Sequence, residues 1–205
     1  MNDVKRPKPD HDRLFEIAAS QGGYFTSAQA RECGFSHALL SHHGSVGRFV
    51  RARRGLYRLR HFPRSPRDHV FEAWLGIGRG VAILSHESAL ELYGLSDVVP
   101  EEVDLTVPRS FRGRRRLPGV RIHTTAHPPG ENEVMIREGI RVTTPARSIV
   151  DAASVGMAPE QVVTAARQAL ARGLATRSQL LEAARKKGRR VSRLVSAALE
   201  LEAGL

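Results

Sequence analysis

The stretch Phe35–Leu59, FSHALLSHHGSVGRFVRARRGLYRL, decides the local fold because its pattern changes from helical to extended at Gly47. Ser36 is a suitable N-cap, since its hydroxyl can accept a hydrogen bond from a backbone N–H of the first helical turn. We expect this helix to end near His43 or Val46. Its predicted buried stripe comprises Phe35, Leu39, Leu40 and Val46.

The second half of this stretch predicts a β-hairpin with strands at residues 49–53 and 56–59. Strict alternation along the first strand would place Arg51 and Arg53 together on its outer face and Val50 inward. The hairpin is therefore expected to present a row of arginines to the solvent.

The residues before this stretch predict two more helices, at 12–21 and 27–33. Asp12 and Thr26 are expected to cap them, and Gly34 suits the position after the second helix, where a positive φ is often needed. Helix, helix, glycine turn, helix and hairpin is the order of a winged helix-turn-helix. In such folds the third helix enters the major groove of DNA.

The candidate DNA contacts on these elements are small polar or basic side chains. They are His37, Ser41 and His42 on the third helix, Arg48 after it, and Arg51, Arg53, Arg54 and Arg58 on the hairpin, or wing. Guanidinium groups bind phosphates bidentately, and small polar side chains suit a helix that enters a groove about 12 Å wide. The alternative is that these arginines form a solvated face of a protein-interaction module.

The neighbouring residues His42 and His43 raise the question of a metal site. Adjacent helical residues point about 100° apart, and no cysteine or carboxylate lies nearby in the sequence. We therefore expect His43 to be partly buried and His42 to lie at the DNA surface. The sequence predicts no metal site and no cofactor.

The composition excludes several classes of protein. The 205 residues include 32 Lys and Arg against 21 Asp and Glu, a formal net charge of +11, and 41% hydrophobic residues suffice for a packed core. Cys33 is the only cysteine, which excludes an internal disulfide framework and a cysteine-based zinc site. The apolar runs are too short to span a membrane, and no secretory signal is recognisable, so we expect a cytoplasmic protein.

The positive charge is concentrated at the two ends of the chain. Residues 1–67 carry 13 basic and 5 acidic side chains, residues 68–158 carry 10 and 12, and residues 159–205 carry 9 and 4. This asymmetry indicates a basic module joined to a part with another role. The expected divisions are a mobile arm at 1–11, a winged helix-turn-helix domain at 12–62, a mixed α+β domain at 63–158 and a helical extension at 159–205.

The middle segment alternates helical patterns with short strands, which predicts an α+β fold with small antiparallel strands. Glu87 and Asp104 lie among its carboxylates, but a metal-dependent nuclease usually adds a lysine, and no lysine lies between Lys8 and Lys186. No nucleophile elbow or phosphate-binding glycine loop is present. We therefore expect no catalytic residues and no enzyme.

A second basic surface is possible outside the N-terminal module. Its candidate residues are Arg112, Arg114, Arg115, Arg116, Lys186, Lys187, Arg189 and Arg190. They could contact nucleic acid or a protein partner, or they could belong to a solvated loop and a solvated interhelical turn.

Several ordered motifs resemble one protein family. They are RFVRARRGLYRL (48–59), LSHESALELYGL (84–95), VDLTVPRS (103–110), PGVRIHTT (118–125) and EGIRVTTPARSIVDAA (138–153). Over about residues 12–160 the chain resembles the AbiEi-type antitoxins of bacterial type IV toxin–antitoxin systems. The resemblance implies a winged-helix DNA-binding domain, an antitoxin domain, repression of the protein's own two-gene operon and a toxin of the nucleotidyltransferase class.

The resemblance also carries over site residues. Ser36, His37, Ser41 and His42 match the recognition helix, and Arg51, Arg53, Arg54 and Tyr57 match the wing. Related chains continue into a nuclease-like domain with acidic and lysine catalytic residues. In this chain only helices are expected after Pro159, which argues against a nuclease-like domain here.

The leading hypothesis is a DNA-binding antitoxin and autorepressor. Its expected partners are its own operator, an inverted repeat bound by a homodimer, and a nucleotidyltransferase-like toxin, with no membrane. One alternative is a module that neutralises a toxin by direct contact without reading DNA. A second alternative is a nuclease or toxin-modifying enzyme.

Overall fold

The computed structural model describes residues 8–112 and 116–203, which form two compact units. Of the described residues, 8–79 with Glu138–Ile140 belong to unit 1, and 80–112, 116–137 and 141–203 belong to unit 2. Both units mix helices and strands, which confirms the predicted α+β class. None of the described helices is long and apolar enough to cross a membrane.

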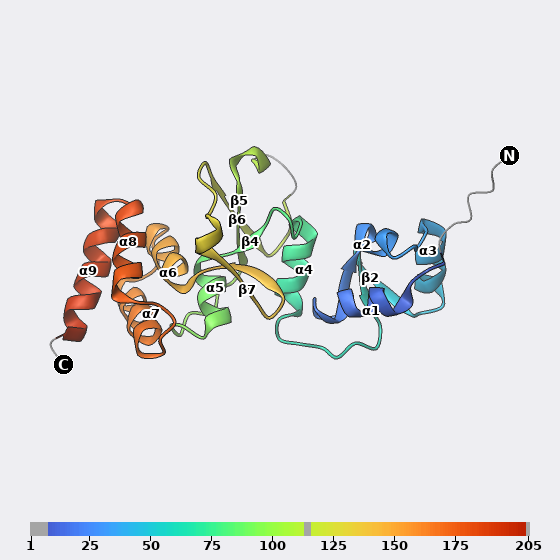
Figure 1. Cartoon of the computed structure of the whole chain (residues 1–205), viewed down its shortest axis with the longest axis horizontal. Helices are drawn as coiled ribbons and strands as arrows, with labels where there is room; N and C mark the ends of the chain where they lie inside the picture. The colour runs from blue at the N-terminus through green and yellow to red at the C-terminus, as the bar shows by residue number, and fades with distance from the viewer. Residues whose placement is uncertain (1–7, 113–115, 204–205) are drawn as a thin grey trace. The chain divides into compact units, whose positions relative to one another are not determined.

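Unit 1 contains the predicted helix-turn-helix and wing, followed by one more helix. Its elements are α1 (His11–Ala19), β1 (Tyr24–Thr26), α2 (Ser27–Glu32), α3 (His37–Ser45), β2 (Phe49–Arg53), β3 (Leu56–Leu59) and α4 (Asp68–Ile77) (Figure 1). The unit extends to Arg79, beyond the end expected at residue 62, and α4 packs against β1 and β3. Of the expected arm, residues 1–7 lie outside the described residues, and His11 already begins α1.

The helix caps differ in one place from the sequence-based prediction. Asp10 rather than Asp12 caps α1, with its carboxylate accepting a hydrogen bond from Arg13 N at 2.9 Å. Thr26 caps α2 as predicted, in a reciprocal capping box with Gln29. Gly34 follows α2 with φ +81°, a left-handed conformation that side chains other than glycine's rarely adopt.

Three antiparallel strands in the order β1-β3-β2 form the small sheet of unit 1. The register places Arg51 opposite Tyr57 and Arg53 opposite Leu56, with an irregularity between Arg51 and Arg53. Such a β-bulge inserts an extra residue, so the two arginines do not share a face. The predicted alternation was therefore wrong, and Val50, expected to point inward, is exposed.

The core of unit 1 joins the helix-turn-helix to one face of this sheet. Its buried members are Leu14, Ala18, Phe25, Ala30, Cys33, Phe35, Leu40, Phe49 and Tyr57. Phe25 packs edge-on against Phe49 and stacks on Tyr57, so β1, β2 and β3 are held together by aromatic contacts. Val46 was expected in the buried stripe but is 54% exposed, because α3 ends at Ser45 and Val46 is its C-cap.

Unit 2 is built on a five-stranded sheet in the order β6-β5-β4-β8-β7. The strands are β4 (Ile83–Leu84), β5 (Val103–Pro108), β6 (Val120–Thr125), β7 (Val134–Arg137) and β8 (Ile140–Thr143). The sheet is mixed, because β5 runs parallel to β6 and β4 runs parallel to β8, while β4 and β5 are antiparallel. The expectation of antiparallel strands was therefore only partly correct.

Five helices accompany this sheet in the described part of unit 2. They are α5 (His86–Tyr93), α6 (Pro145–Ser154), α7 (Pro159–Ala171), α8 (Arg177–Lys186) and α9 (Arg189–Ala203). The three C-terminal helices lie where the sequence predicts them, and α9 packs against both α7 and α8 (Figure 1). Small buried side chains, Ala165 and Ala169 on α7 and Ala198 on α9, are compatible with this close packing. Two short 3-10 turns, at Arg109–Phe111 and Glu131–Glu133, complete the unit.

Candidate nucleic-acid interface

The third helix of unit 1, α3, presents a polar surface to the solvent. Ser36 caps it, with its hydroxyl accepting a hydrogen bond from Leu39 N at 3.2 Å. The side chains predicted to face outward, those of Ser36, His37, Ser41 and His42, are all exposed. Leu40 and His43 are the buried residues of the helix and hold it on the core. The free surface of α3 is therefore small, polar and capable of hydrogen bonding.

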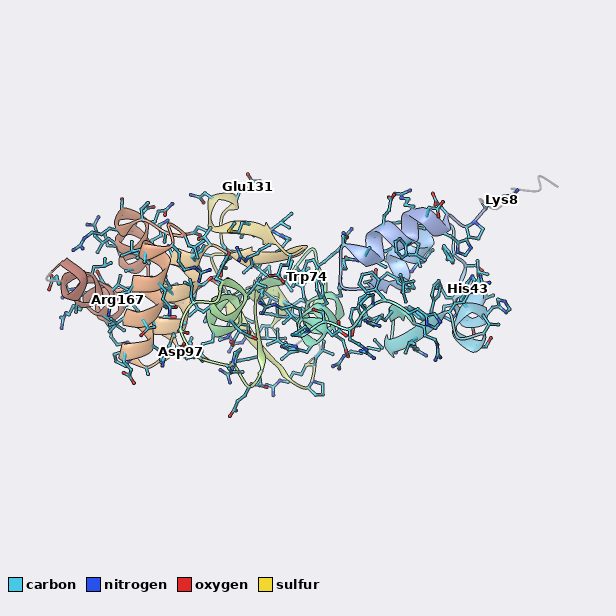
Figure 2. All side chains as sticks on the ribbon, turned by 90° about the horizontal axis from the view of Figure 1, so that it is seen from below. Lys8, His43, Trp74, Asp97, Glu131 and Arg167 are labelled. Carbon is cyan, nitrogen blue, oxygen red and sulfur yellow. The ribbon has the colours of Figure 1, made fainter. Side chains whose placement is uncertain are left out.

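The side chain of His43 on this helix belongs to the core of unit 1 (Figure 2). Only 5% of it is exposed, and its ring lies among those of His11, Phe35 and Phe49. Burial, followed by the nearby charges of His11 and Arg48, lowers the pKa of His43. Neither ring nitrogen has a hydrogen-bond partner among the described residues. His43 thus acts as a neutral core aromatic residue and not as a DNA contact.

A basic groove lies between α2, α3 and the wing. It has a volume of about 200 Å³ and is lined by residues that include Arg31, His37, Arg51, Arg54 and Tyr57. Arg31 comes from α2, before the recognition helix in the sequence, and Arg51 and Arg54 come from the wing, after it. All three line the same groove. Arg31, on α2, was missed by the sequence-based reasoning, which considered only the third helix and the wing.

Three predicted wing contacts are instead held by other parts of unit 1. Tyr57 is buried in the core, where it stacks on Phe25. Arg53 is half-buried, and its Nε lies 2.5 Å from Glu72 Oε1 of α4. The β-bulge explains the position of Arg53, because it turns this side chain to the side of the sheet on which α4 packs. Arg48, Arg51 and Arg54 remain exposed.

Arg58 is the third displaced residue, and it is only 5% exposed. Its Nη2 donates hydrogen bonds to the carbonyl oxygens of Phe62 (2.9 Å) and Pro63 (2.8 Å) and lies 3.6 Å from Asp68 Oδ2. The guanidinium also sits over the Tyr24 ring, 5.5 Å from its centroid. Arg58 therefore fastens the segment after the wing to the sheet.

Replacing Arg58 with Met should destabilise unit 1. Asp68 and two partly buried carbonyl groups would lose a donor, and breaking a buried ion pair typically costs about 3 kcal/mol or more. Because Arg64 still pairs with Asp68, we expect the unfolding free energy to fall by about 2–3 kcal/mol. Urea unfolding followed by the fluorescence of Trp74, the only tryptophan, measures this change.

The control for this variant is Arg60→Met, which removes an exposed arginine two residues away. Surface changes of this kind usually alter stability by less than about 0.5 kcal/mol. Equal stability of the Arg58→Met and Arg60→Met proteins would contradict the structural role of Arg58.

The described residues that the sequence suggested for a second basic surface differ in their surroundings, so they do not form one continuous set of free cations. Arg112, Arg116 and Arg189 are exposed, whereas Arg114 and Arg115 lie outside the described residues. The remaining three residues are engaged within unit 2. Lys186 pairs with Glu133 and Glu182, Lys187 pairs with Asp151, and Arg190 donates to the carbonyl oxygens of Ala153 and Ser154.

Comparisons with known proteins relate the N-terminal segment to one family. Residues 12–60 match the family described as "Transcriptional regulator, AbiEi antitoxin", the family that the sequence resembles. The match covers the helix-turn-helix and the wing, so the resemblance is confirmed for this part of the chain. That family is one of antitoxin transcriptional regulators.

A solved structure extends the fold comparison to nearly the whole chain. The crystal structure of the RV2827C protein from Mycobacterium tuberculosis is similar, with a TM-score of 0.56 and 14% sequence identity. The similarity covers 96% of this chain and 78% of that one. No curated protein matches the sequence significantly. The two chains therefore share an architecture at low sequence identity.

Proposed function

We propose that the chain is a DNA-binding antitoxin that represses its own operon and counteracts a nucleotidyltransferase-type toxin. The observation that carries this proposal is the basic groove beside the exposed face of α3, in the segment that matches the regulator family. The side chains that face the solvent there are arginines and small polar residues. Arginines can bind the phosphates of duplex DNA, and small polar side chains can form hydrogen bonds with its base edges.

The proposed division of labour follows from the position of each group. The α3 side chains Ser36, His37, Ser41 and His42 read base edges in the major groove, where each base pair presents a distinct pattern of donors and acceptors. Arg31, Arg51 and Arg54 bind phosphates and hold the helix in register. A homodimer on an inverted repeat would place two such helices about one helical turn apart.

Unit 2 is the part that we assign to the toxin. Its residues before 159 carry nine basic and nine acidic side chains, and the unit has its own sheet and helices, so it does not depend on the wing for its structure. Its partner is proposed to be the nucleotidyltransferase-like protein encoded beside this chain.

Two measurements test the proposal. The first is binding of the full chain to the duplex upstream of its own gene, with a shuffled duplex of equal length as the control; specific antitoxins should prefer the upstream duplex by about 1000-fold or more. The second is growth of cells that express the neighbouring gene with and without this chain. Equal binding to both duplexes would overturn the regulatory role, and unrelieved toxicity would overturn the antitoxin role.

A further inference from the structure

Unit 2 contains a polar cavity that the proposed DNA-binding role does not use. Its volume is about 390 Å³, within the usual range for small-molecule sites. The polar side chains in its wall come from α5, β5, β6, α6 and the turn after α8. They include His86, His123, Thr124, Arg147, Asp151 and Lys187.

Two stacked imidazole rings form one side of this cavity. The rings of His86 and His123 lie 3.6 Å apart between centroids and are inclined by only 15°. The buried Asp104 holds His123, with 2.7 Å between Oδ1 and Nε2. Parallel pairing of β5 with β6 brings these two residues together, although they are 19 positions apart.

A hydrogen-bond chain orients the other ring. Thr106 Oγ1 donates to Ser85 Oγ at 2.8 Å, so the proton of Ser85 is available for Nδ1 of His86, also at 2.8 Å. A neutral His86 that accepts at Nδ1 carries its own proton on Nε2. Nε2 of His86 and Nδ1 of His123 have no hydrogen-bond partner among the described residues. Each ring thus has one nitrogen available for a ligand.

The backbone at His86 is strained. His86 has φ +52°, in the left-handed region that residues other than glycine seldom occupy, and it stands where β4 passes into α5. Such conformations cost about 1–3 kcal/mol, persist only when the surroundings enforce them, and are concentrated at functional sites. The strained residue is the one whose ring stacks on His123 at the cavity.

A buried carboxylate in the cavity wall holds two cations. Asp151 is only 1% exposed, its two carboxylate oxygens share the single N–H of Arg147 Nε at 2.9 and 3.0 Å, and it pairs with Lys187. Glu133, outside the cavity wall, binds Nη1 of Arg147 at 2.8 Å. Nη2 of Arg147 has no partner among the described residues, and Lys187 has further N–H groups to donate.

We propose that this cavity binds the phosphate group of a phosphate ester, with space beside it for an attached sugar. Arg147 and Lys187 supply charge-assisted donors, Nε2 of His86 supplies a neutral donor, and the Thr124 hydroxyl can complete the shell. Asp151 fixes the two cations in place before the ligand arrives, which reduces the entropy lost on binding. Either a free nucleotide or the phosphorylated end of a nucleic-acid strand offers this chemistry. The lining residues of this site all belong to unit 2.

The test uses the full chain with Arg51 and Arg54 replaced by Ala, so that binding at the wing does not interfere. Inorganic phosphate, adenosine 5′-monophosphate and unphosphorylated adenosine are titrated by calorimetry, and the His86 and His123 ring signals are followed by NMR. We expect saturable binding of phosphate and the monophosphate, with shifts of both ring signals, and no such response to adenosine. A trinucleotide with and without a 5′-phosphate then distinguishes a strand end from a free nucleotide by which binds more tightly.

Two adjacent lysines provide a matched pair of variants. Lys187→Met should weaken binding of the monophosphate about tenfold, because it removes a charged donor from the cavity wall. Lys186→Met removes the same charge next to it, from a side chain that pairs with Glu133 and Glu182 and does not line this cavity, so its effect should stay within about twofold.

If Lys187→Met fails to fold, Lys187→Gln replaces it; it also removes the charge from the cavity wall, so the same direction of loss is expected. The proposal is overturned if the folded parent protein shows no saturable binding of phosphate or the monophosphate at millimolar concentration, or if adenosine binds equally well. It is also overturned if Lys186→Met and Lys187→Met weaken binding equally, because the effect would then be one of net charge. None of these results depends on whether unit 1 binds its operator.

Discussion

Replacing Arg51 and Arg54 together with Ala is expected to weaken binding to the upstream duplex about 60-fold at 0.1 M salt. Each phosphate that a cation neutralises contributes about 0.9 to the slope of log K against log salt concentration. Two contacts therefore raise log K by about 1.8 when the salt concentration falls from 1 M to 0.1 M. Losing both contacts removes this gain, which corresponds to about a 60-fold weaker affinity at 0.1 M salt. Both side chains are exposed and line the groove beside α3, so their removal should leave the core intact.

The salt dependence separates this prediction from a simple loss of folding. Titrations at several salt concentrations should show a slope that is less steep by about 1.8 in the double variant. Adding Arg31→Ala should reduce the slope by about 0.9 more, because Arg31 lines the same groove. Thermal unfolding of each variant checks that the winged helix remains folded.

Arg53→Ala is the control within the same strand. Its guanidinium is already paired with Glu72, so the slope should not change, although the protein becomes somewhat less stable. A slope that is unchanged in the double variant, or equally reduced by Arg53→Ala, would contradict the assignment of the wing contacts.

The second large effect is expected in acid, and it comes from His86. Burial, followed by the neighbouring His123, lowers the pKa of His86 to about 3, whereas an unfolded histidine titrates near 6.5. Above pH 6.5 both states are unprotonated and the residue has no effect on stability. As the pH falls below 6.5, the unfolded state takes up a proton that the folded state refuses, so stability is lost until about pH 3.

The size of this loss follows from the same shift. Each pH unit within the window costs about 1.4 kcal/mol, so the unfolding free energy should fall by about 3 kcal/mol between pH 7 and pH 4 from this residue. His86→Asn should remove that part of the pH dependence. Asn is a suitable replacement, because it tolerates the left-handed conformation that His86 adopts with φ +52°.

Chemical unfolding of the wild type and of His86→Asn at pH 7 and pH 4 measures the difference. His127→Asn, a change at an exposed histidine of the same unit, should keep the acid sensitivity of the wild type. If His86→Asn loses as much stability in acid as the wild type does, the buried neutral state of His86 is refuted.

Local patterns in the sequence predicted the recognition helix and part of the candidate site. The spacing of Phe35, Leu39 and Leu40 identified the buried side of α3, so the exposure of His37, Ser41 and His42 was predicted correctly. The same reasoning failed for Arg53, because a bulge of one residue reverses the face of every later side chain. No local pattern identified Arg31 as a candidate contact, because its closeness to the wing depends on how the helices pack in the tertiary structure.

The sequence by itself determined the order of the elements, the winged helix and the three C-terminal helices, because these depend on caps, turns and periodicities within a few residues. Only the tertiary structure decided which arginines are free and which are structural. It also decided that His86, His123 and Asp151 meet around one cavity, and that the buried Asp104 holds His123 there. The physical reason is that such meetings depend on strand register and on pairing between distant segments, for which a local pattern carries no information.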